Sequence, residues 1–255
     1  MIDTHTHLYV EDFDDDRDEV IQRAIENGVK QFYLPAIDSA YTKKMLTLEK
    51  AYPDYVKLMM GLHPTHVKAN VKEELAHVKS ELDRHNYCAV GEIGIDLYRD
   101  KSFLADQKVA FDTQIKWAKE KKLPIVIHCR EAFEEVFEVL ENNKGEDLYG
   151  VFHCFTGTES DAERAISYNL KLGIGGVVTF KNGKIDQFLH RIPLSSLVLE
   201  TDAPYLAPTP YRGKRNESAY LSLIVNKLSD IYQLPESTIA SVTTKNAQAV
   251  FDRLK

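Results

Sequence analysis

Short apolar runs alternate with amphipathic stretches along the whole chain. Eight runs have the length and composition of buried β-strands, and each is followed by a stretch that can form a helix. The predicted strands cover residues 1–6, 30–37, 56–62, 88–93, 124–129, 150–155, 171–175 and 197–201. Strands that alternate with helices pair in parallel, and eight such units favour an α/β fold of the (β/α)₈ TIM barrel type. An open doubly wound sheet is the alternative.

Residues that stop helices mark the ends of several predicted helices. Gly28 follows the first of them, and Pro53 lies just beyond the second. The last stretch, residues 235–254, is expected to form two short helices. The length of 255 residues is close to that of one barrel, about 250. No linker, repeat or low-complexity segment interrupts the pattern, so residues 1–255 are predicted to form a single domain.

Composition and charge restrict the classes of function. Apolar residues make up 44% of the chain and charged residues 28%, as in ordinary globular domains. The net charge of −7 argues against a protein that coats nucleic acid through a broad basic face, but it allows a nucleic-acid substrate that is gripped locally. There is no bilayer-spanning apolar run, no secretory signal and no evident obligate protein partner. Three widely spaced cysteines do not suggest a disulfide framework, so a cytoplasmic location is expected.

Polar residues that can bind metals stand at the ends of five predicted strands. His5 and His7 are two apart on the first strand, so both side chains point to the same face. In a barrel, the carboxyl ends of all strands meet at one rim, where active sites lie. A lone histidine at a strand end is usually an ordinary polar group. A whole cluster of histidines and carboxylates at one rim is different, because burying unpaired or like-charged groups without a metal would cost free energy. The predicted ligands of one or two divalent ions are His5, His7, Glu92, His128, His153 and Asp202.

The types of ligand limit the choice of metal. Imidazole and carboxylate groups suit zinc, manganese, iron or nickel, and a site that keeps waters also accepts magnesium. Cys129 and Cys154 each follow a predicted ligand, and strand alternation turns them toward the surrounding helices as packing residues. Asp3 shares the face of His5 and His7, where it either orients a histidine or has a structural role at the barrel floor. The remaining histidines, at positions 77, 85 and 190, are expected to be ordinary surface residues.

Eight segments of the chain resemble motifs of the TatD family of metal-dependent deoxyribonucleases, within the amidohydrolase-like superfamily of metal-dependent hydrolases. They run in the family's order from residue 3 to residue 216, and the last two are specific to the family. The segments are Asp3-Thr-His-Thr-His7, Gly61-Leu-His-Pro64, Gly91-Glu-Ile-Gly-Ile-Asp96, Pro124-Ile-Val-Ile-His-Cys-Arg130, His153-Cys-Phe-Thr-Gly157, Gly173-Ile-Gly-Gly176, Leu199-Glu-Thr-Asp-Ala-Pro-Tyr-Leu-Ala-Pro208 and Arg212-Gly-Lys-Arg-Asn216.

Three positions depart from the pattern that the family usually shows. Ser218 stands where proline is usual, and Thr156 stands where serine is common. Leu97 precedes Tyr98 where the family typically carries two aromatic residues. These positions line the outer rim, so they bear on substrate preference and leave the metal ligands unchanged.

The resemblance implies a nuclease or related phosphodiesterase that uses one or two divalent ions. A metal lowers the pKa of bound water to about 7, and a carboxylate beside that water can take its proton, which makes Asp202 the predicted general base. By analogy with the family, the first ion is held by His5, His7 and Asp202, the second by His128 and His153, and Glu92, the other predicted catalytic residue, bridges the two.

Several residues near the same rim are candidates for holding the substrate. His63 and His66 follow the third strand, and Arg130 follows the fifth. Arg212 and Arg215, with Lys214 between them, form a basic loop after the eighth strand, and guanidinium groups bind phosphate oxygens in pairs. The alternative for this loop is a solvated charged surface.

Three aromatic residues close to the rim could take part in binding. Tyr98, Phe155 and Tyr205 could stack on nucleobases, or they could serve in packing.

Three functions remain open from the residues themselves. The first is a metal-dependent phosphodiesterase that acts on DNA, which the basic loop favours. The second is an amidohydrolase or esterase that acts on a small amide, a lactone or an aminoacyl ester, which the net charge favours. The third is a metal-binding or interaction protein that keeps the fold without catalysis, which the complete ligand set disfavours.

Overall fold

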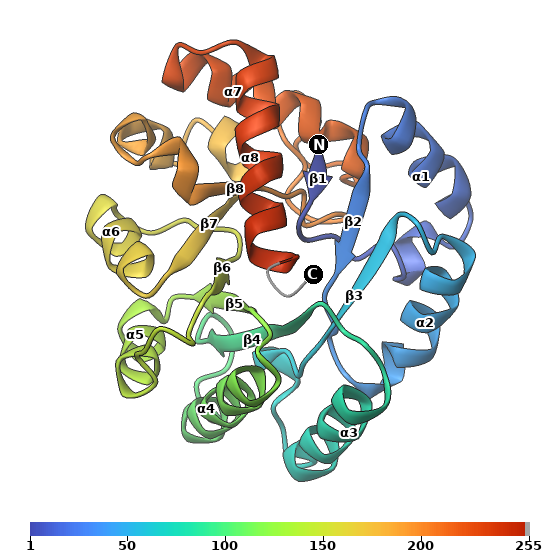
Figure 1. Cartoon of the computed structure of the whole chain (residues 1–255), viewed down its shortest axis with the longest axis vertical. Helices are drawn as coiled ribbons and strands as arrows, with labels where there is room; N and C mark the ends of the chain where they lie inside the picture. Colours follow the sequence, from blue (N-terminus) through green and yellow to red (C-terminus); the bar gives the residue numbers. More distant parts are fainter. Residues whose placement is uncertain (253–255) are drawn as a thin grey trace.

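The chain forms a parallel β-barrel surrounded by helices (Figure 1). The computed structural model describes residues 1–252. Eight strands lie in sequence order in one sheet, and every neighbouring pair is parallel. The strands are β1 (Ile2–Asp3), β2 (Gln31–Leu34), β3 (Val56–Met60), β4 (Ala89–Asp96), β5 (Ile125–Arg130), β6 (Gly150–Phe152), β7 (Leu170–Ile174) and β8 (Leu197–Leu199).

The first strand returns to the last one. The amide of Thr4 donates to the carbonyl of Leu199 at 3.0 Å, and Thr6 forms a parallel bridge with Ala203. This strand order and the contacts between the two ends confirm the predicted (β/α)₈ TIM barrel and exclude the open doubly wound sheet.

Helices follow most of the strands, with two differences from the prediction. The helices are α1 (Arg17–Glu26), α2 (Thr42–Ala51), α3 (Val71–Arg84), α4 (Leu104–Lys121), α5 (Phe133–Asn142), α6 (Glu159–Ser167), α7 (Leu221–Tyr232) and α8 (Glu236–Phe251). The expectation of a helix after every strand is wrong after β7, where residues 176–196 form only short 3₁₀ turns. Gly183 and Pro193 lie in this connection, and both residue types interrupt α-helices.

The C-terminal stretch also differs from the prediction of two short helices. Between residues 236 and 251 it is one continuous helix, α8. No glycine or proline occurs within this range, so nothing interrupts the backbone hydrogen bonds. Residues 253 and 254, which the prediction included, lie outside the described residues.

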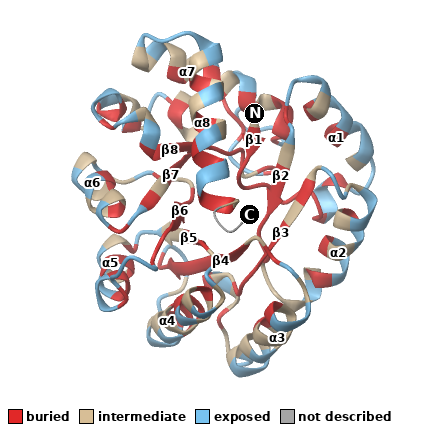
Figure 2. Cartoon of the chain, viewed as in Figure 1, coloured by how far each residue is buried: buried red, intermediate tan, exposed pale blue. Residues whose placement is uncertain are grey.

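The side chains of the sheet belong to two apolar clusters, one outside the barrel and one inside it. The larger cluster fills the space between the sheet and the helices around it, and Figure 2 shows the buried strands and the buried inner faces of the helices. The smaller cluster lies inside the barrel, where side chains such as Tyr33 and Val126 meet Val250 and Phe251 of α8. In Figure 1, α8 lies in front of the strands at this end of the barrel. Because α8 covers this floor, the barrel interior is accessible from the carboxyl ends of the strands.

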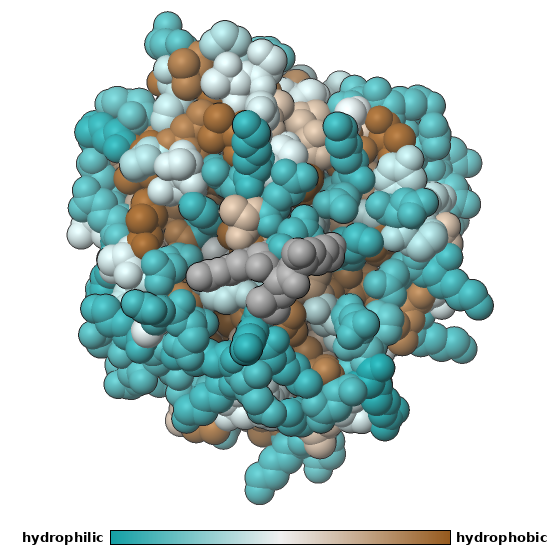
Figure 3. Space-filling model, in the orientation of Figure 1, coloured by the Kyte–Doolittle hydropathy of each residue, from teal (hydrophilic) through white to brown (hydrophobic). Residues whose placement is uncertain are grey.

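The outer surface is mainly polar on the face that carries α8. Figure 3 shows this face, with hydrophilic side chains over most of it and hydrophobic patches between them. No helix among residues 1–252 is long and apolar enough to span a membrane.

Candidate metal centre

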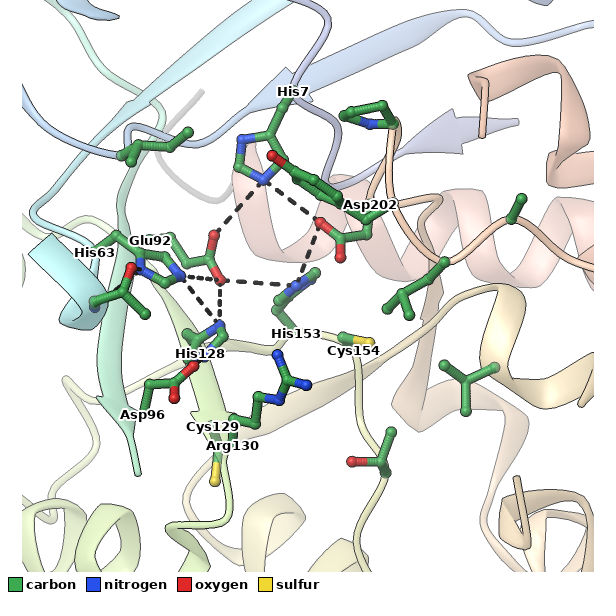
Figure 4. A pocket seen from close by; sticks show the side chains of 18 of the residues that line it. His7, His63, Glu92, Asp96, His128, Cys129, Arg130, His153, Cys154 and Asp202 are labelled. Atoms are coloured by element: carbon green, nitrogen blue, oxygen red, sulfur yellow. Dashed lines mark hydrogen bonds and ion pairs between the residues drawn. The ribbon is translucent and has the colours of Figure 1, made fainter. Parts of the chain in front are cut away.

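The structure brings the six predicted metal ligands together at the open end of the barrel. Figure 4 shows five of them, all except His5. Glu92 and His128 lie within β4 and β5, and the other four follow the ends of β1, β6 and β8 by a few residues. Figure 4 shows His7, Asp202 and His153 on one side of Glu92 and His128 on the other. The convergence depends on the parallel order of the strands, which places all of their carboxyl ends at one rim.

An irregularity in the sheet places Glu92 between its neighbours. The register of β4 against β5 shifts between Val90 and Ile93. Gly91 lies in this shift, and a Cβ atom there would come within 2.7 Å of the Cβ atom of Val126. Only glycine allows this approach, so the local sequence Gly-Glu fixes where the carboxylate enters the barrel mouth.

Four of the six side chains gather on one side of Glu92. The Nε2 atoms of His5 and His7 are 3.3 Å apart, and they lie 3.1 and 3.8 Å from Oε2 of Glu92. Oδ1 of Asp202 lies 3.8 Å from Nε2 of His5 and 3.5 Å from that of His7. The ring of His153 stacks on that of His5 at 3.4 Å, with its Nε2 atom 3.8 Å from Oδ1 of Asp202.

A second group faces the other oxygen of Glu92. Nδ1 of His128 lies 2.9 Å from Oε1 of Glu92. Nε2 of His63 lies 3.5 Å from the same oxygen and 3.3 Å from Nδ1 of His128. Each oxygen of Glu92 thus faces a different set of nitrogens, which is the arrangement that a carboxylate between two cations requires.

These distances fit the coordination of a divalent ion. Ligands at about 2.0–2.2 Å from a tetrahedral metal lie about 3.4 Å from one another, and the donor atoms around Glu92 are separated by 2.9–3.8 Å. Nδ1 of His5 is buried without a hydrogen-bond partner among residues 1–252, so these residues supply no acceptor for that nitrogen. The donor set therefore fits one or two metal ions such as zinc, manganese or magnesium.

The second nitrogen of each of three histidines faces an acceptor. Nε2 of His128 lies 2.8 Å from Oδ2 of Asp96, and Nδ1 of His153 lies 2.9 Å from Oε1 of Glu200. Nδ1 of His7 lies 2.9 Å from the hydroxyl of Tyr9, which itself donates to the carbonyl of Pro35. An acceptor on one ring nitrogen holds the proton there and directs the lone pair of the other nitrogen toward the centre.

His63 has the opposite arrangement. The amide of Thr65 donates to Nδ1 of His63 at 3.1 Å, which favours the proton on Nε2, the atom that faces Glu92. Burial lowers the pKa of His63 to about 4, so the ring is neutral at pH 7. His63 thus offers a hydrogen-bond donor to the cavity, whereas His128 and His153 offer lone pairs once their protons are displaced.

Neighbouring charges set the protonation of the other groups. Burial by itself would raise the pKa of Glu92, but the surrounding imidazoles, foremost His5, hold it well below its ordinary value. Burial would lower the pKa of His128, but contacts with Asp96 and Glu92 raise it to about 9. Metal binding at such a ring must therefore displace a proton, as at other protein metal sites.

The sequence did not identify the supporting groups Asp96, Glu200 and Tyr9. Glu200 could have been found, because it lies two residues before Asp202 and a strand directs such a pair to one face. Its carboxylate occupies the space beside Gly173, where a Cβ atom would come within 2.1 Å of Oε2. Asp3, for which two roles were open, accepts hydrogen bonds from the amide and hydroxyl of Thr201. It thereby joins β1 to the segment after β8.

A cavity of about 820 Å³ opens over the centre, within the range of about 300–1,000 Å³ for ligand sites. Of the predicted substrate-binding residues, His63, His66, Arg130 and Arg212 line it, together with Lys214. The guanidinium of Arg130 lies over the ring of Tyr98 at 3.7 Å, and that of Arg212 lies over the ring of Phe180 at 3.9 Å. These stacked positions hold both cations at the cavity wall.

Arg215 does not share this position. Its guanidinium donates to both carboxylate oxygens of Asp16 and to the backbone carbonyl of Asp12, and it is not among the residues that line the cavity. An acidic neighbour thus already neutralises the charge of Arg215, and its role in substrate binding stays a prediction. Lys214, one residue earlier, lines the cavity instead.

The structure also places Phe155 and the two cysteines. Phe155, for which stacking on a base and packing were both open, is buried, 1% exposed, and packs against Phe133 and Phe152. Cys129 packs against the apolar core, as expected, and both Cys129 and Cys154 also line the cavity. Cys154 has a φ of 44°, so the chain has left the regular strand there and alternation no longer applies.

Comparison with known proteins places these features in a family. The family model described as TatD related DNase matches residues 2–252. The Bacillus subtilis (strain 168) protein named "Uncharacterized metal-dependent hydrolase YabD" is 37% identical over 252 residues, which cover 98% of both chains. The Erwinia tasmaniensis protein named "3'-5' ssDNA/RNA exonuclease TatD" is 32% identical over 258 residues, which cover 99% of this chain and 100% of the relative.

A solved structure shows the same architecture. The crystal structure of YjjV, a TatD homologue from Escherichia coli K12, superimposes with a TM-score of 0.93 at 30% sequence identity. The match covers 99% of this chain and 98% of that one. The likeness extends over the whole barrel, including the strand ends that carry the centre.

Proposed function

The chain belongs to the TatD related DNase family of metal-dependent hydrolases, and from this premise we propose that it removes nucleotides from the end of single-stranded DNA or RNA. The relatives named 3'-5' ssDNA/RNA exonuclease suggest the substrate and the direction. The observation that carries the proposal is the position of Glu92, with one oxygen toward each of two groups of nitrogens at the bottom of a cavity with cationic walls. An esterase for small neutral substrates would not need those cations.

The proposed ligands fall into two sets around Glu92. His5, His7 and Asp202 would hold one divalent ion, with magnesium, manganese or zinc as candidates. His128 and His153 would hold the second, because His153, although it also contacts His5 and Asp202, has its Nε2 atom 3.7 Å from Oε1 of Glu92, the oxygen that His128 faces at 2.9 Å. Bound ions of this kind lower the pKa of water to about 7 and stabilise developing charge on a phosphodiester. Asp202 presents Oδ1 to the histidines, which leaves its other oxygen to accept a proton from the attacking water.

Cationic and donor groups on the cavity wall would position the substrate. His63 would donate from Nε2 to a phosphate oxygen, since its other nitrogen already accepts from Thr65. Arg130 and Arg212 would bind neighbouring phosphates from their stacked positions. The two stacked arginines add positive potential where the substrate lies, although the whole chain carries −7, and His63, which is neutral, adds only an N–H donor. We place this activity in the cytoplasm, in keeping with the wide spacing of the cysteines.

An assay with end-labelled strands tests the proposal. Purified protein is incubated with single-stranded DNA, single-stranded RNA and duplex DNA, each labelled at either end, in magnesium, manganese or zinc. Stepwise shortening from the 3' end is expected, and Asp202→Asn serves as the inactive control. A protein that leaves all strands intact but hydrolyses a lactone, a small amide or an aminoacyl ester would overturn the proposal.

A further inference from the structure

The ring of Tyr205 stands half exposed beside the metal centre. Tyr205 is 49% exposed and lines the cavity, and its ring centre lies 5.9 Å from that of His7. Leu206, which also lines the cavity, is 41% exposed. These two side chains, the Tyr205 shelf, form an apolar surface next to a group of charged and polar donors. A shelf of this kind suits a ligand that is anionic at one end and flat and apolar at the other.

The backbone under the shelf is fixed. The amide of Tyr205 donates to the carbonyl of Asp202 at 2.7 Å. The fully buried side chain of Asn216 donates to the carbonyls of Tyr205 and Thr201, both at 2.7 Å. These bonds hold the shelf at a constant position relative to Asp202, so a ligand that stacks on it loses little free energy to ordering of the protein.

Other aromatic rings near the cavity are already covered. The guanidinium of Arg130 lies over Tyr98, and that of Arg212 lies over Phe180. Tyr211, on the same loop as Tyr205, stacks against Tyr220 with ring centres 4.4 Å apart. Among the described residues, Tyr205 has His7 as its one ring neighbour, in an edge-on contact. Because the two ring planes are inclined by 67°, His7 is not stacked on Tyr205 and can meet only one of its faces, which leaves the other face without a ring of the described residues against it.

We propose that Tyr205 stacks on the base next to the scissile phosphodiester and thereby selects an unpaired nucleotide. The inference rests on the proposed nuclease function, because the metal centre then holds the phosphate and the adjoining base must lie beside it. Every nucleobase has a flat π-face, so stacking on an aromatic ring tolerates any sequence. A base within a duplex is paired and covered on both faces, and it would have to leave the helix first. Tyr205 is thus a specificity-determining residue for single-stranded ends.

Abasic strands separate stacking from other effects of Tyr205. Cleavage is measured for an ordinary single strand and for two strands that carry a tetrahydrofuran abasic site at the terminal or the penultimate position. Tyr205→Leu should lower kcat/KM on the ordinary strand by roughly 10- to 100-fold, the range for loss of one stacked base. Tyr205→Phe, which keeps the ring, should retain most of the activity. The matched control is Tyr211→Leu, which removes an exposed tyrosine of the same loop outside the cavity.

One of the two abasic strands should reveal the stacked base. On that strand, kcat/KM of the wild type should be lower than on the ordinary strand by about the factor that Tyr205→Leu causes there. Tyr205→Leu should not lower kcat/KM on the abasic strand any further. The proposal is overturned if Tyr205→Leu reduces cleavage equally on all three strands, or if it matches the wild type on the ordinary strand. A wild type that leaves every strand intact in all three metals would overturn the nuclease function together with this proposal, so the two failures are distinguishable.

Discussion

The metal centre and the cavity wall above it use the same kinds of side chain for different tasks. His128 and His63 approach the same oxygen of Glu92, at 2.9 and 3.5 Å. Behind His128 lies a carboxylate, whereas behind His63 lies a backbone amide. An acceptor behind a ring directs its lone pair forward to a metal, and a donor behind a ring directs its proton forward to an anion. The second contact of each histidine therefore indicates its role, which the residue type alone cannot do.

Arginines on the wall follow a related rule. Arg212 lies on an aromatic ring, which leaves its N–H groups available to a ligand, although one of them contacts Oδ1 of Asn182 at 3.4 Å. Arg215, three residues away, also lies over a ring, that of Phe13 at 4.8 Å, but it has both of its terminal nitrogens on Asp16. A ring behind a guanidinium holds the cation in place, whereas a carboxylate neutralises it. The distinction between centre and wall can be tested by changes in both regions.

The largest effect is expected from Asp202→Asn in the centre. Asparagine keeps the shape of the side chain but loses the charge and the proton acceptor. Removal of a general base typically costs 10²- to 10⁴-fold, and the same residue is also a proposed ligand, so kcat should fall by about 10³-fold or more. Turnover is measured at saturating metal, and thermal unfolding should show that the fold is intact. Wild-type turnover in this variant would exclude Asp202 as the base.

Changes behind the ligands should have smaller effects, and these should fall on metal affinity. Glu200→Gln and Asp96→Asn remove the charge behind His153 and His128, and each should weaken binding of one metal by roughly 10- to 100-fold. The measurement is titration of the metal-free protein with manganese or zinc. Asp100→Asn is the control, because Asp100 pairs with Lys68 and contacts no histidine. If all three variants bind metal equally, the carboxylates do not orient the ligands.

His63→Ala should separate the wall from the centre. If His63 donates to the substrate, the variant, which has no donor at this position, should retain its metal but lose about tenfold in kcat/KM, as expected for a hydrogen bond to a charged group. His128→Ala, by contrast, should lower the metal content itself. Metal analysis and kinetics on the same preparations decide between the roles. Loss of metal in His63→Ala would show that His63 is a ligand and that its tautomer is reversed.

The periodic pattern of the chain is sufficient to predict most of the fold and the convergence of the proposed ligands. Eight apolar runs predict the strands, and the order of a barrel then brings His5 and Asp202 together although they lie at opposite ends of the sequence. The supporting contacts are harder to predict, because they depend on which strand lies beside which and in what register. Asp96 reaches His128 because β4 and β5 pair with Gly94 opposite His128. That alignment follows from packing across the barrel, which the local sequence does not encode.

The contacts of loop residues are even harder to predict from the sequence. Arg212, Lys214 and Arg215 are alike in sequence, but the loop turns Arg215 toward Asp16, which is far away in the chain. Composition predicts a basic loop, and only the contacts of each side chain show which charges remain for a ligand. Helix prediction after β7 failed for a similar reason, because a length of chain that can hold a helix does not have to form one.

The smallest effect is expected from single arginines on the wall, and it is best seen in the salt dependence. Each phosphate contact to a single strand contributes roughly 0.7 to the slope of log affinity against log salt. Arg212→Ala should therefore lower the slope by about 0.7. The ratio of wild-type to variant affinity would then change by only about 2.5-fold over a fourfold range of salt. Arg215→Ala should leave the slope unchanged, because Asp16 already neutralises that cation. Metal content should be unchanged in both variants, and KM for a short DNA strand is measured from low to high ionic strength.

Equal slopes in the wild type and Arg212→Ala would mean that the loop does not hold phosphate. A reduced slope in Arg215→Ala would mean that its ion pair with Asp16 opens when substrate binds.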